Sequence, residues 1–201
     1  MKTAIPSSMS SPLRAHILKR ISITEDEFKQ SLTFFTPKKL KKHQFFLQDG
    51  DVCRNLGFVT KGCLRIYTTD AKGDEHVIQF AIEDWWVSDL NSFLSDKPST
   101  WDIDALEPSE LLLLEKNDRE KLLAAVPKME RFFRLLQEAN YVATHKRINE
   151  SLSASAEERY LSFIKTYPAL VRRIPQNQIA SYLGITAQSL SRIRKELSHK
   201  K

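Results

Sequence analysis

The residues best suited to binding chemistry lie near the C-terminal end, in the stretch IASYLGITAQSLSRIRKEL at 179–197. On a helix that turns about 100° per residue, the apolar side chains after residue 186 fall on one side and polar ones on the other. The polar side holds Gln188, Ser191, Arg192 and Lys195. Arginine can donate two hydrogen bonds to guanine, glutamine can pair with adenine, and lysine or serine can contact phosphate. This helix is therefore predicted to enter the major groove of DNA.

The residues before this helix predict a helix-turn-helix. A first short helix over 176–183 offers Ile179, Ala180 and Leu183 to a common core. Gly184 provides the backbone freedom for a sharp turn, and Thr186 is placed to cap the next helix. The full set of candidate DNA-binding residues is Thr186, Gln188, Ser189, Ser191, Arg192, Arg194 and Lys195.

The charge distribution supports the same interpretation. The 201-residue chain has a net charge of +6, and residues 172–201 hold seven of the 31 cations but only one of the 25 anions. The preceding residues are therefore neutral overall. Such asymmetry is typical of a nucleic-acid-binding module joined to a neutral domain, although a solvated basic tail would show it too.

Composition sets the protein class. The chain is 41% hydrophobic and 28% charged, as in ordinary globular proteins, and its length allows two domains. It has no run of roughly 18 to 20 apolar residues and no apolar signal-peptide segment, so we expect a cytoplasmic protein with no membrane partner. Cys53 and Cys63 fit neither a disulfide framework nor a zinc site and are expected to be ordinary thiols.

The first two thirds of the chain predict helices followed by strands. Residues 13–35 have helical apolar spacing, and Thr24 with Glu27 forms a predicted capping box. From about 44 to 115, short apolar runs alternate with turn-forming pieces, and Gly50, Gly62 and Gly73 lie where hairpins would turn. Many short strands at close spacing indicate a β-barrel or sandwich.

A short helix stopped by Pro127 and a long helix from 128 to about 152 are expected next. The long helix carries an apolar stripe that we assign to a parallel two-fold homodimer, while packing within its own chain remains the alternative. The predicted dimerisation residues are Met129, Phe132, Phe133, Leu136, Ala139 and Ala143. Ser155 and Glu158 predict a capping box that opens a further helix after a hinge at 151–155.

This order of parts resembles the CRP/FNR superfamily, the cyclic-AMP receptor protein and its relatives. The stretch FFLQDGDVCRNLGFVTKGCLRIY at 45–67 is similar to the family's opening β-roll hairpins, and IPQNQIASYLGITAQSLSRIRKEL at 174–197 is similar to its DNA-binding unit. The resemblance implies an α+β chain with a β-roll sensor at 1–127, a dimerisation helix at 128–152 and a helix-turn-helix domain at 153–201. It also implies a palindromic double-stranded DNA site and RNA polymerase as a candidate partner.

Three positions of the second helix are compared with residues by which the family contacts DNA. Gln188 and Arg192 fall on the family's base-contacting glutamate and arginine, and Ala187 falls on an upstream arginine, so a different base sequence is expected. The sequence ends soon after Leu197, so the family's β-hairpin wing is expected to be short or absent.

The sensor segment WWVSDLNSFLSDKPSTWDIDAL at 85–106 departs further. It lacks the family's Gly-Glu pair, and no arginine occurs between Arg65 and Arg119. Cyclic nucleotide binding is therefore not expected, because a cyclic phosphate needs a fixed guanidinium. A pocket for an unidentified small-molecule effector, if one exists, would use Trp85, Trp86, Asp89, Lys97, Ser99 and Thr100, and no cofactor or metal is expected.

The alternative from another class is a small cupin-like β-barrel metal enzyme with a helical oligomerisation tail. Such an enzyme needs two or three histidines and a carboxylate at one metal, with a close histidine pair on a strand. His76 has no such neighbour in the sequence. The favoured interpretation is a non-enzymatic DNA-binding regulator.

Overall fold

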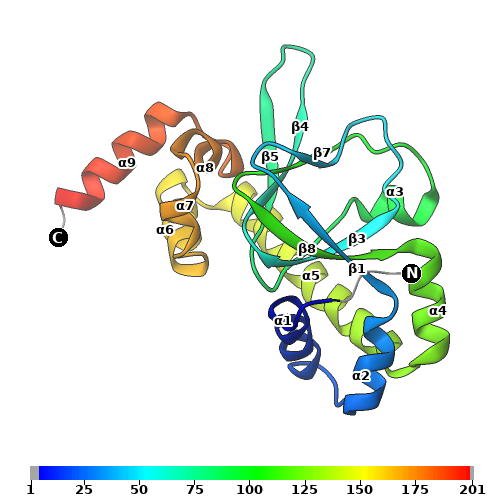
Figure 1. Cartoon of the computed structure of the whole chain (residues 1–201). Coiled ribbons are helices and arrows are strands. Elements are labelled where there is room, and N and C mark those ends of the chain that lie inside the picture. The colour runs from blue at the N-terminus through cyan, green and yellow to red at the C-terminus, as the bar shows by residue number, and fades with distance from the viewer. Residues whose placement is uncertain (1–4, 200–201) are drawn as a thin grey trace. The chain divides into compact units, whose positions relative to one another are not determined.

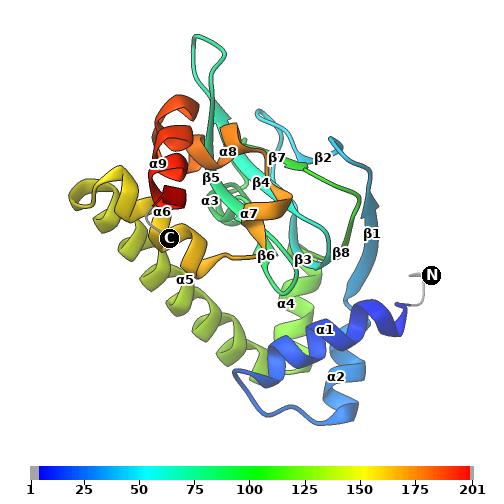
Figure 2. The same ribbon diagram turned by 90° about the vertical axis from the view of Figure 1, so that its left-hand side faces the viewer.

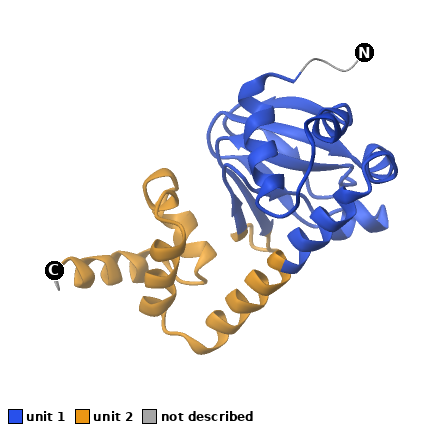
Figure 3. Ribbon diagram, turned by 90° about the horizontal axis from the view of Figure 1, so that it is seen from below, with its two compact units in different colours: residues 1–68, 79–138 blue, residues 69–78, 139–201 orange. Residues whose placement is uncertain are grey.

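A computed structural model describes residues 5–199. The chain divides into two compact units, which Figure 3 shows in different colours and which we describe separately. Unit 1 comprises residues 1–68 and 79–138, and unit 2 comprises residues 69–78 and 139–201. The predicted domain boundaries at 127 and 152 remain predictions, since the long helix contributes residues to both units.

The β-structure is formed by two four-stranded sheets with strand orders β1-β8-β3-β6 and β2-β7-β4-β5 (Figure 1). The strands are β1 (Phe35–Leu40), β2 (Phe45–Leu47), β3 (Asn55–Lys61), β4 (Leu64–Thr69), β5 (Glu75–Ala81), β6 (Trp86–Val87), β7 (Asp102–Ala105) and β8 (Ser109–Glu115). The pairs β1–β8, β3–β8, β3–β6, β2–β7 and β4–β7 are antiparallel. The predicted β-roll is therefore present.

The central strands β3 and β8 are buried on both faces. Phe58 and Val59 are adjacent in β3 and fully buried, as are Leu111 and Leu112 in β8. A strand with one face in solvent would alternate between buried and exposed residues. Here helix α1 (Ser7–Leu18) packs against both strands and covers the second face. Burial on both faces explains the continuous apolar run of four leucines at 111–114 in β8.

The first helical segment forms two helices, α1 and α2 (Glu25–Leu32), as the capping box predicted at Thr24 requires. Its bounds differ from the predicted 13–35, because α1 begins at Ser7 and Phe35 begins β1. The capping box explains the break: the Thr24 hydroxyl accepts from the Glu27 amide at 3.2 Å, and the Glu27 carboxylate accepts from the Thr24 amide at 2.8 Å. A residue that caps a helix cannot also continue one.

Three glycines have the left-handed backbone that their predicted turns require. Gly50, Gly62 and Gly73 have φ values of 87°, 101° and 87°. At Gly62 a Cβ atom would lie 2.2 Å from Ser109 Oγ and 2.7 Å from Ser109 Cα, so a side chain is excluded by space as well as by φ.

The remaining helices of unit 1 are α3 (Leu90–Ser95), α4 (Lys116–Ala125) and the first part of α5 (Lys128–Ser153). Helix α5 is the long helix predicted from the sequence, and Figure 2 shows its length. Its first turns complete the core of unit 1. Met129 and Phe132 are fully buried, and Phe133 and Leu136 are 4% and 5% exposed.

Unit 2 contains the rest of α5, the β4–β5 hairpin tip, and four further helices. These are α6 (Ala156–Thr166), α7 (Leu170–Arg173), α8 (Gln176–Tyr182) and α9 (Ala187–His199). The predicted capping box at Ser155 is present: its hydroxyl accepts from the Glu158 amide at 3.2 Å, and Glu158 accepts from the Ser155 amide at 2.8 Å. No described helix is long and apolar enough to cross a membrane.

Candidate nucleic-acid interface

The turn between α8 and α9 is formed by Gly184. Its φ is +66°, the Ile185 amide donates to the Ala180 carbonyl at 3.0 Å, and the Gly184 amide donates to the Ser181 carbonyl at 3.0 Å. This pair of hydrogen bonds is the Schellman motif, in which a left-handed residue ends a helix. The turn ends α8 and redirects the chain within a few residues.

Helix α9 packs on α8 and α6 through its apolar side. Leu190 is fully buried, and Ile193 and Leu197 are half-buried. The opposite side is exposed along its length at Gln188, Ser191, Arg192 and Lys195. The amphipathic division predicted from the sequence is therefore confirmed for α9.

The cations of α9 are available to a ligand. Arg192, Arg194 and Lys195 are exposed and, among the side chains that the structure describes, form no ion pair. Arg194 lies between the apolar and polar sides of the helix, closer to the apolar one. Arg192 and Lys195 thus lie on one continuous face with Gln188 and Ser191, and Arg194 lies beside it.

Two of the candidate DNA-binding residues have a local structural role. The Thr186 hydroxyl accepts from the Ser189 amide at 3.1 Å and lies 2.9 Å from the Ser189 hydroxyl. Thr186 thus caps α9 as predicted, and half-buried Ser189 helps to hold the cap. Their hydroxyls order the first turn of α9, where Gln188 projects.

Helix α8 is held by the β5 part of unit 2. The Ser181 hydroxyl donates to the Glu75 carbonyl at 2.9 Å and accepts from the Val77 amide at 2.9 Å. Arg147 on α5 donates to the Ile78 carbonyl. The Ser181 bonds attach α8, which supports α9, to the β5 segment, and the Arg147 bond attaches α5 to the same segment.

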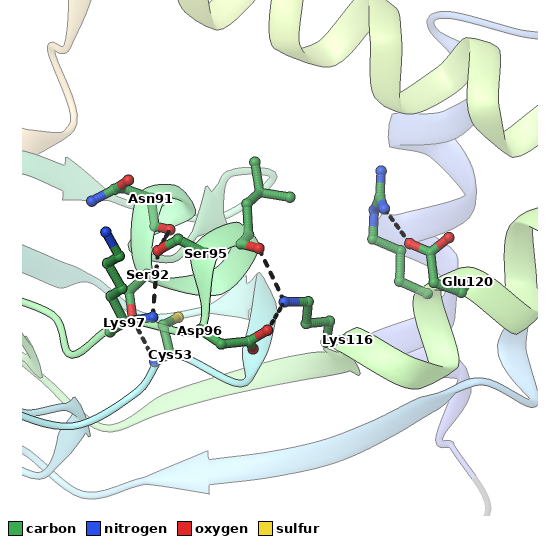
Figure 4. A network of polar contacts seen from close by, with 10 residues as sticks. Cys53, Asn91, Ser92, Ser95, Asp96, Lys97, Lys116 and Glu120 are labelled. Atoms are coloured by element: carbon green, nitrogen blue, oxygen red, sulfur yellow. Dashed lines mark hydrogen bonds and ion pairs between the residues drawn. The ribbon is translucent and has the colours of Figure 1, made fainter.

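The sensor segment of unit 1 forms a closed polar network. The Asp89 carboxylate accepts from the Ser92 amide at 3.1 Å and from the Ser99 hydroxyl at 2.8 Å. The Ser92 hydroxyl donates to the Lys97 carbonyl at 2.6 Å and accepts from the Cys53 amide at 2.9 Å (Figure 4). All three side chains, at Asp89, Ser92 and Ser99, are at most 4% exposed. The segment places a buried carboxylate, which repels an anion, beside hydroxyls that are already bonded.

The other predicted effector residues do not converge. Trp86 packs into an aromatic cluster, 5.4 Å from Phe58 and 5.5 Å from Phe133 between ring centroids. Lys97 and Thr100 are exposed, and Trp85 is half-buried. Trp86 is half-buried and its ring contacts Phe58 of β3 and Phe133 of α5, so its assignment to an effector pocket stays a prediction.

The predicted dimerisation stripe also needs correction in its first half. Met129, Phe132, Phe133 and Leu136 are buried in the core of unit 1 and cannot contact a second chain. Only Ala139 and Ala143 of the predicted set are exposed. The large exposed apolar side chains of the second half are Tyr141, Val142, Ile148 and Leu152, at 65%, 67%, 47% and 83% exposure.

The chain is similar to known proteins of this architecture. A model of the cyclic nucleotide-binding domain family matches residues 37–125. Regulatory protein HlyX of Actinobacillus pleuropneumoniae is 23% identical over 186 residues, which cover 86% of this chain and 76% of that protein. FixK2 from Bradyrhizobium japonicum matches with a TM-score of 0.71 at 16% identity, covering 83% of this chain and 85% of that one. The Thermus thermophilus catabolite activator protein matches with a TM-score of 0.56 at 19% identity, covering 89% and 85%.

The chain has the CRP/FNR fold. These structural matches cover 89% and 83% of this chain, so they confirm the predicted α+β fold and its likeness to the CRP/FNR fold. HlyX and the Thermus protein are named as a regulator and an activator, and none of the three is named as an enzyme.

The metal-enzyme alternative gains no support from the part of the chain that the structure describes. Within residues 5–199, no three histidine, cysteine, aspartate or glutamate side chains form a group that could hold a metal ion. Cys53 and Cys63 are buried and unbonded to each other, and burial raises the pKa of the Cys53 thiol. Both cysteines are free thiols within the described residues, and their ordinary role stays a prediction.

Sequence reasoning missed a group of residues inside unit 2. Phe163, Tyr167 and Tyr182 come together from α6, the segment after it and α8, and Arg147 lies 5.2 Å from the Tyr182 ring centroid. The sequence predicted only that a further helix begins near Ser155. The proximity of Arg147 from α5 could not be inferred from local spacing.

Proposed function

We propose that this protein is a transcription regulator of the CRP/FNR type that binds a palindromic DNA site as a homodimer. The observation that carries the proposal is the exposed face of α9, with Gln188, Arg192 and Lys195 opposite a fully buried Leu190. The fold and the names of the matched regulators support it. In this function α9 is the recognition helix, and two copies contact half-sites about one helical turn apart.

The residue types assign separate roles along α9. Arg192 can contact a guanine through two donors, and Gln188 can contact an adenine, so both residues specify sequence. Lys195 is a flexible point charge suited to phosphate, which contributes affinity without sequence information. Thr186 and Ser189 order the helix terminus and can add phosphate contacts.

The second copy is proposed to pack on the exposed part of α5. Val142, His145, Asn149 and Leu152 repeat at intervals of three and four residues, and the Tyr141 ring contacts the His145 ring at 4.2 Å between centroids. That spacing is typical of a two-helix seam. Ala139 and Ala143 lie near this seam, while contact with RNA polymerase remains a prediction.

The β-roll is proposed to act as a scaffold or as a sensor for a ligand other than a cyclic nucleotide. The buried Asp89 and the absence of arginine between residues 65 and 119 support this part of the proposal. An effector that prefers one arrangement of the dimer would shift the population whose recognition helices fit the groove.

Selection from a random duplex library with the full chain tests the proposal. We expect enrichment of a palindrome. Arg192→Ala should lose about 1 to 3 kcal/mol at one base pair in each half-site, whereas Lys195→Ala should weaken all sequences alike. Failure to enrich any palindrome, with a folded dimer, contradicts the proposal.

A further inference from the structure

A cavity of about 430 Å³ lies inside unit 2, between α5, α6, α8 and β5. Its volume is in the range of small-molecule sites. Phe163, Tyr167 and Tyr182 contribute to its wall, and Phe163 is the centre of the group, with ring centroids 5.6 Å from Tyr167 and 5.4 Å from Tyr182. The cavity therefore has an aromatic wall on which a planar ring can pack.

The same cavity has a cationic wall. Lys146, Arg147 and Arg159 line it, with Glu150 as the one carboxylate among its lining residues. Glu150 is already occupied, since it lies 3.8 Å from the Lys146 ammonium and 3.3 Å from the Ser162 hydroxyl. The lining thus carries an excess of positive charge, which favours an anionic ligand.

Arg159 is the cation with unused hydrogen-bonding capacity. One of its terminal nitrogens donates to the Ala154 carbonyl at 2.9 Å, which fixes the guanidinium at the wall. Its Nε is buried and has no acceptor among the described residues. A buried donor without an acceptor is unfavourable, so a carboxylate that enters beside the guanidinium would be stabilised after a small rotation of the side chain.

The Tyr167 phenol does not oppose an anion. Burial, followed by the neighbouring Tyr182, raises the pKa of Tyr167 to about 12. Tyr167 therefore remains protonated and uncharged at neutral pH. Its hydroxyl adds polarity to the cavity without adding negative charge.

We propose that this cavity binds a small aromatic carboxylate, with the ring against the half-buried Tyr167 and Tyr182 and the carboxylate at Arg159. The site is separate from the β-roll segment considered above, and its existence does not depend on DNA binding. Val77 and Ser181 also line the cavity, and their hydrogen bond joins β5 to α8. A ligand here would therefore contact the helix that supports the recognition helix.

Isothermal titration of the full chain with benzoate tests the proposal, in the absence of DNA. We expect saturable binding of one benzoate per chain. Benzamide, which keeps the ring but lacks the charge, and cyclohexanecarboxylate, which keeps the charge but lacks the aromatic ring, should each bind at least tenfold more weakly. Equal binding of either compound or of inorganic phosphate, or no heat with millimolar benzoate, overturns the proposal.

Matched variants locate the site. Ala143→Phe adds a ring at a lining position and should abolish benzoate binding, while Thr144→Phe, an exposed change at the next position outside the lining, should leave it unchanged. Arg159→Gln should weaken binding at least tenfold, and Lys165→Gln, which removes an exposed charge from the same helix, should not.

A second variant of a lining cation is needed, because Arg159 also donates hydrogen bonds to backbone carbonyls and its replacement could unfold the chain. If Arg159→Gln does not fold, Lys146→Gln replaces it, since that side chain is 71% exposed and its loss should weaken binding about threefold without unfolding the chain. Unchanged binding in Ala143→Phe and in a folded charge variant refutes the site. Because no DNA is present, this result is distinguishable from a failure to enrich a palindrome.

Discussion

A buried histidine makes the stability of unit 1 dependent on pH. His16 on α1 is 5% exposed, with its ring 5.1 Å from Phe58 and 5.8 Å from Phe132 between centroids. Burial, followed by the positive charge of Arg20, lowers the pKa of His16 from 6.5 to about 4. The aromatic surroundings therefore hold the imidazole in its neutral form at neutral pH.

The direction of this pH dependence follows from the protonation of His16 in the folded and in the unfolded chain. Between pH 6.5 and about 4 the unfolded chain binds a proton at His16 and the folded chain does not, so the free energy of unfolding falls as the pH is lowered. At roughly 1.4 kcal/mol for each pH unit, the loss between pH 7 and pH 4.5 is about 2 to 3 kcal/mol. Above pH 6.5 the contribution of His16 is fully present.

Urea unfolding at a series of pH values, followed by circular dichroism, measures this loss. Carboxylates also titrate between pH 7 and pH 4.5, so His16→Leu is the matched variant. It places an apolar side chain of similar size in the same core and removes the titrating group. The wild type should lose about 2 to 3 kcal/mol more than His16→Leu between pH 7 and pH 4.5. Parallel pH profiles for the two proteins would refute the assignment of a neutral, buried His16.

Three further perturbations test the fold and the proposed dimer. Gly62→Ala should destabilise the chain by about 3 kcal/mol or more in urea unfolding, because its Cβ would meet the Ser109 backbone at 2.7 Å, whereas Gly73→Ala, with no atom within 4 Å, should cost only about 1 to 2 kcal/mol. Asp104→Asn should cost about 1.5 to 3 kcal/mol by thermal or urea unfolding, since it removes the buried carboxylate that lies 2.7 Å from the Arg65 guanidinium; a cost near zero would contradict this. Leu152→Asp, at an 83% exposed position, should leave the melting temperature of the monomer unchanged but shift the dimer toward monomer in sedimentation velocity, and an unaltered dimer would exclude this part of α5 from the interface.

The sequence by itself determined the local features of this protein. The capping boxes at Thr24 and Ser155, the left-handed turns at Gly62 and Gly184, and the amphipathic division of α9 are all found where residue type and spacing predicted them. Each depends on interactions between residues a few positions apart, so the information is contained in a short window.

Only the tertiary structure decided which apolar and polar groups are covered. The apolar residues of α5 repeat with the same spacing along the helix, yet Phe132 is fully buried in the core of unit 1 and Val142 is 67% exposed. Asp89 and Ser99, ten residues apart, close on each other, while Arg159 and Phe163 line a cavity with residues from α5, α8 and β5. Burial and charge pairing depend on segments distant in the chain, because a local period specifies which face of an element is apolar but not what will pack against it.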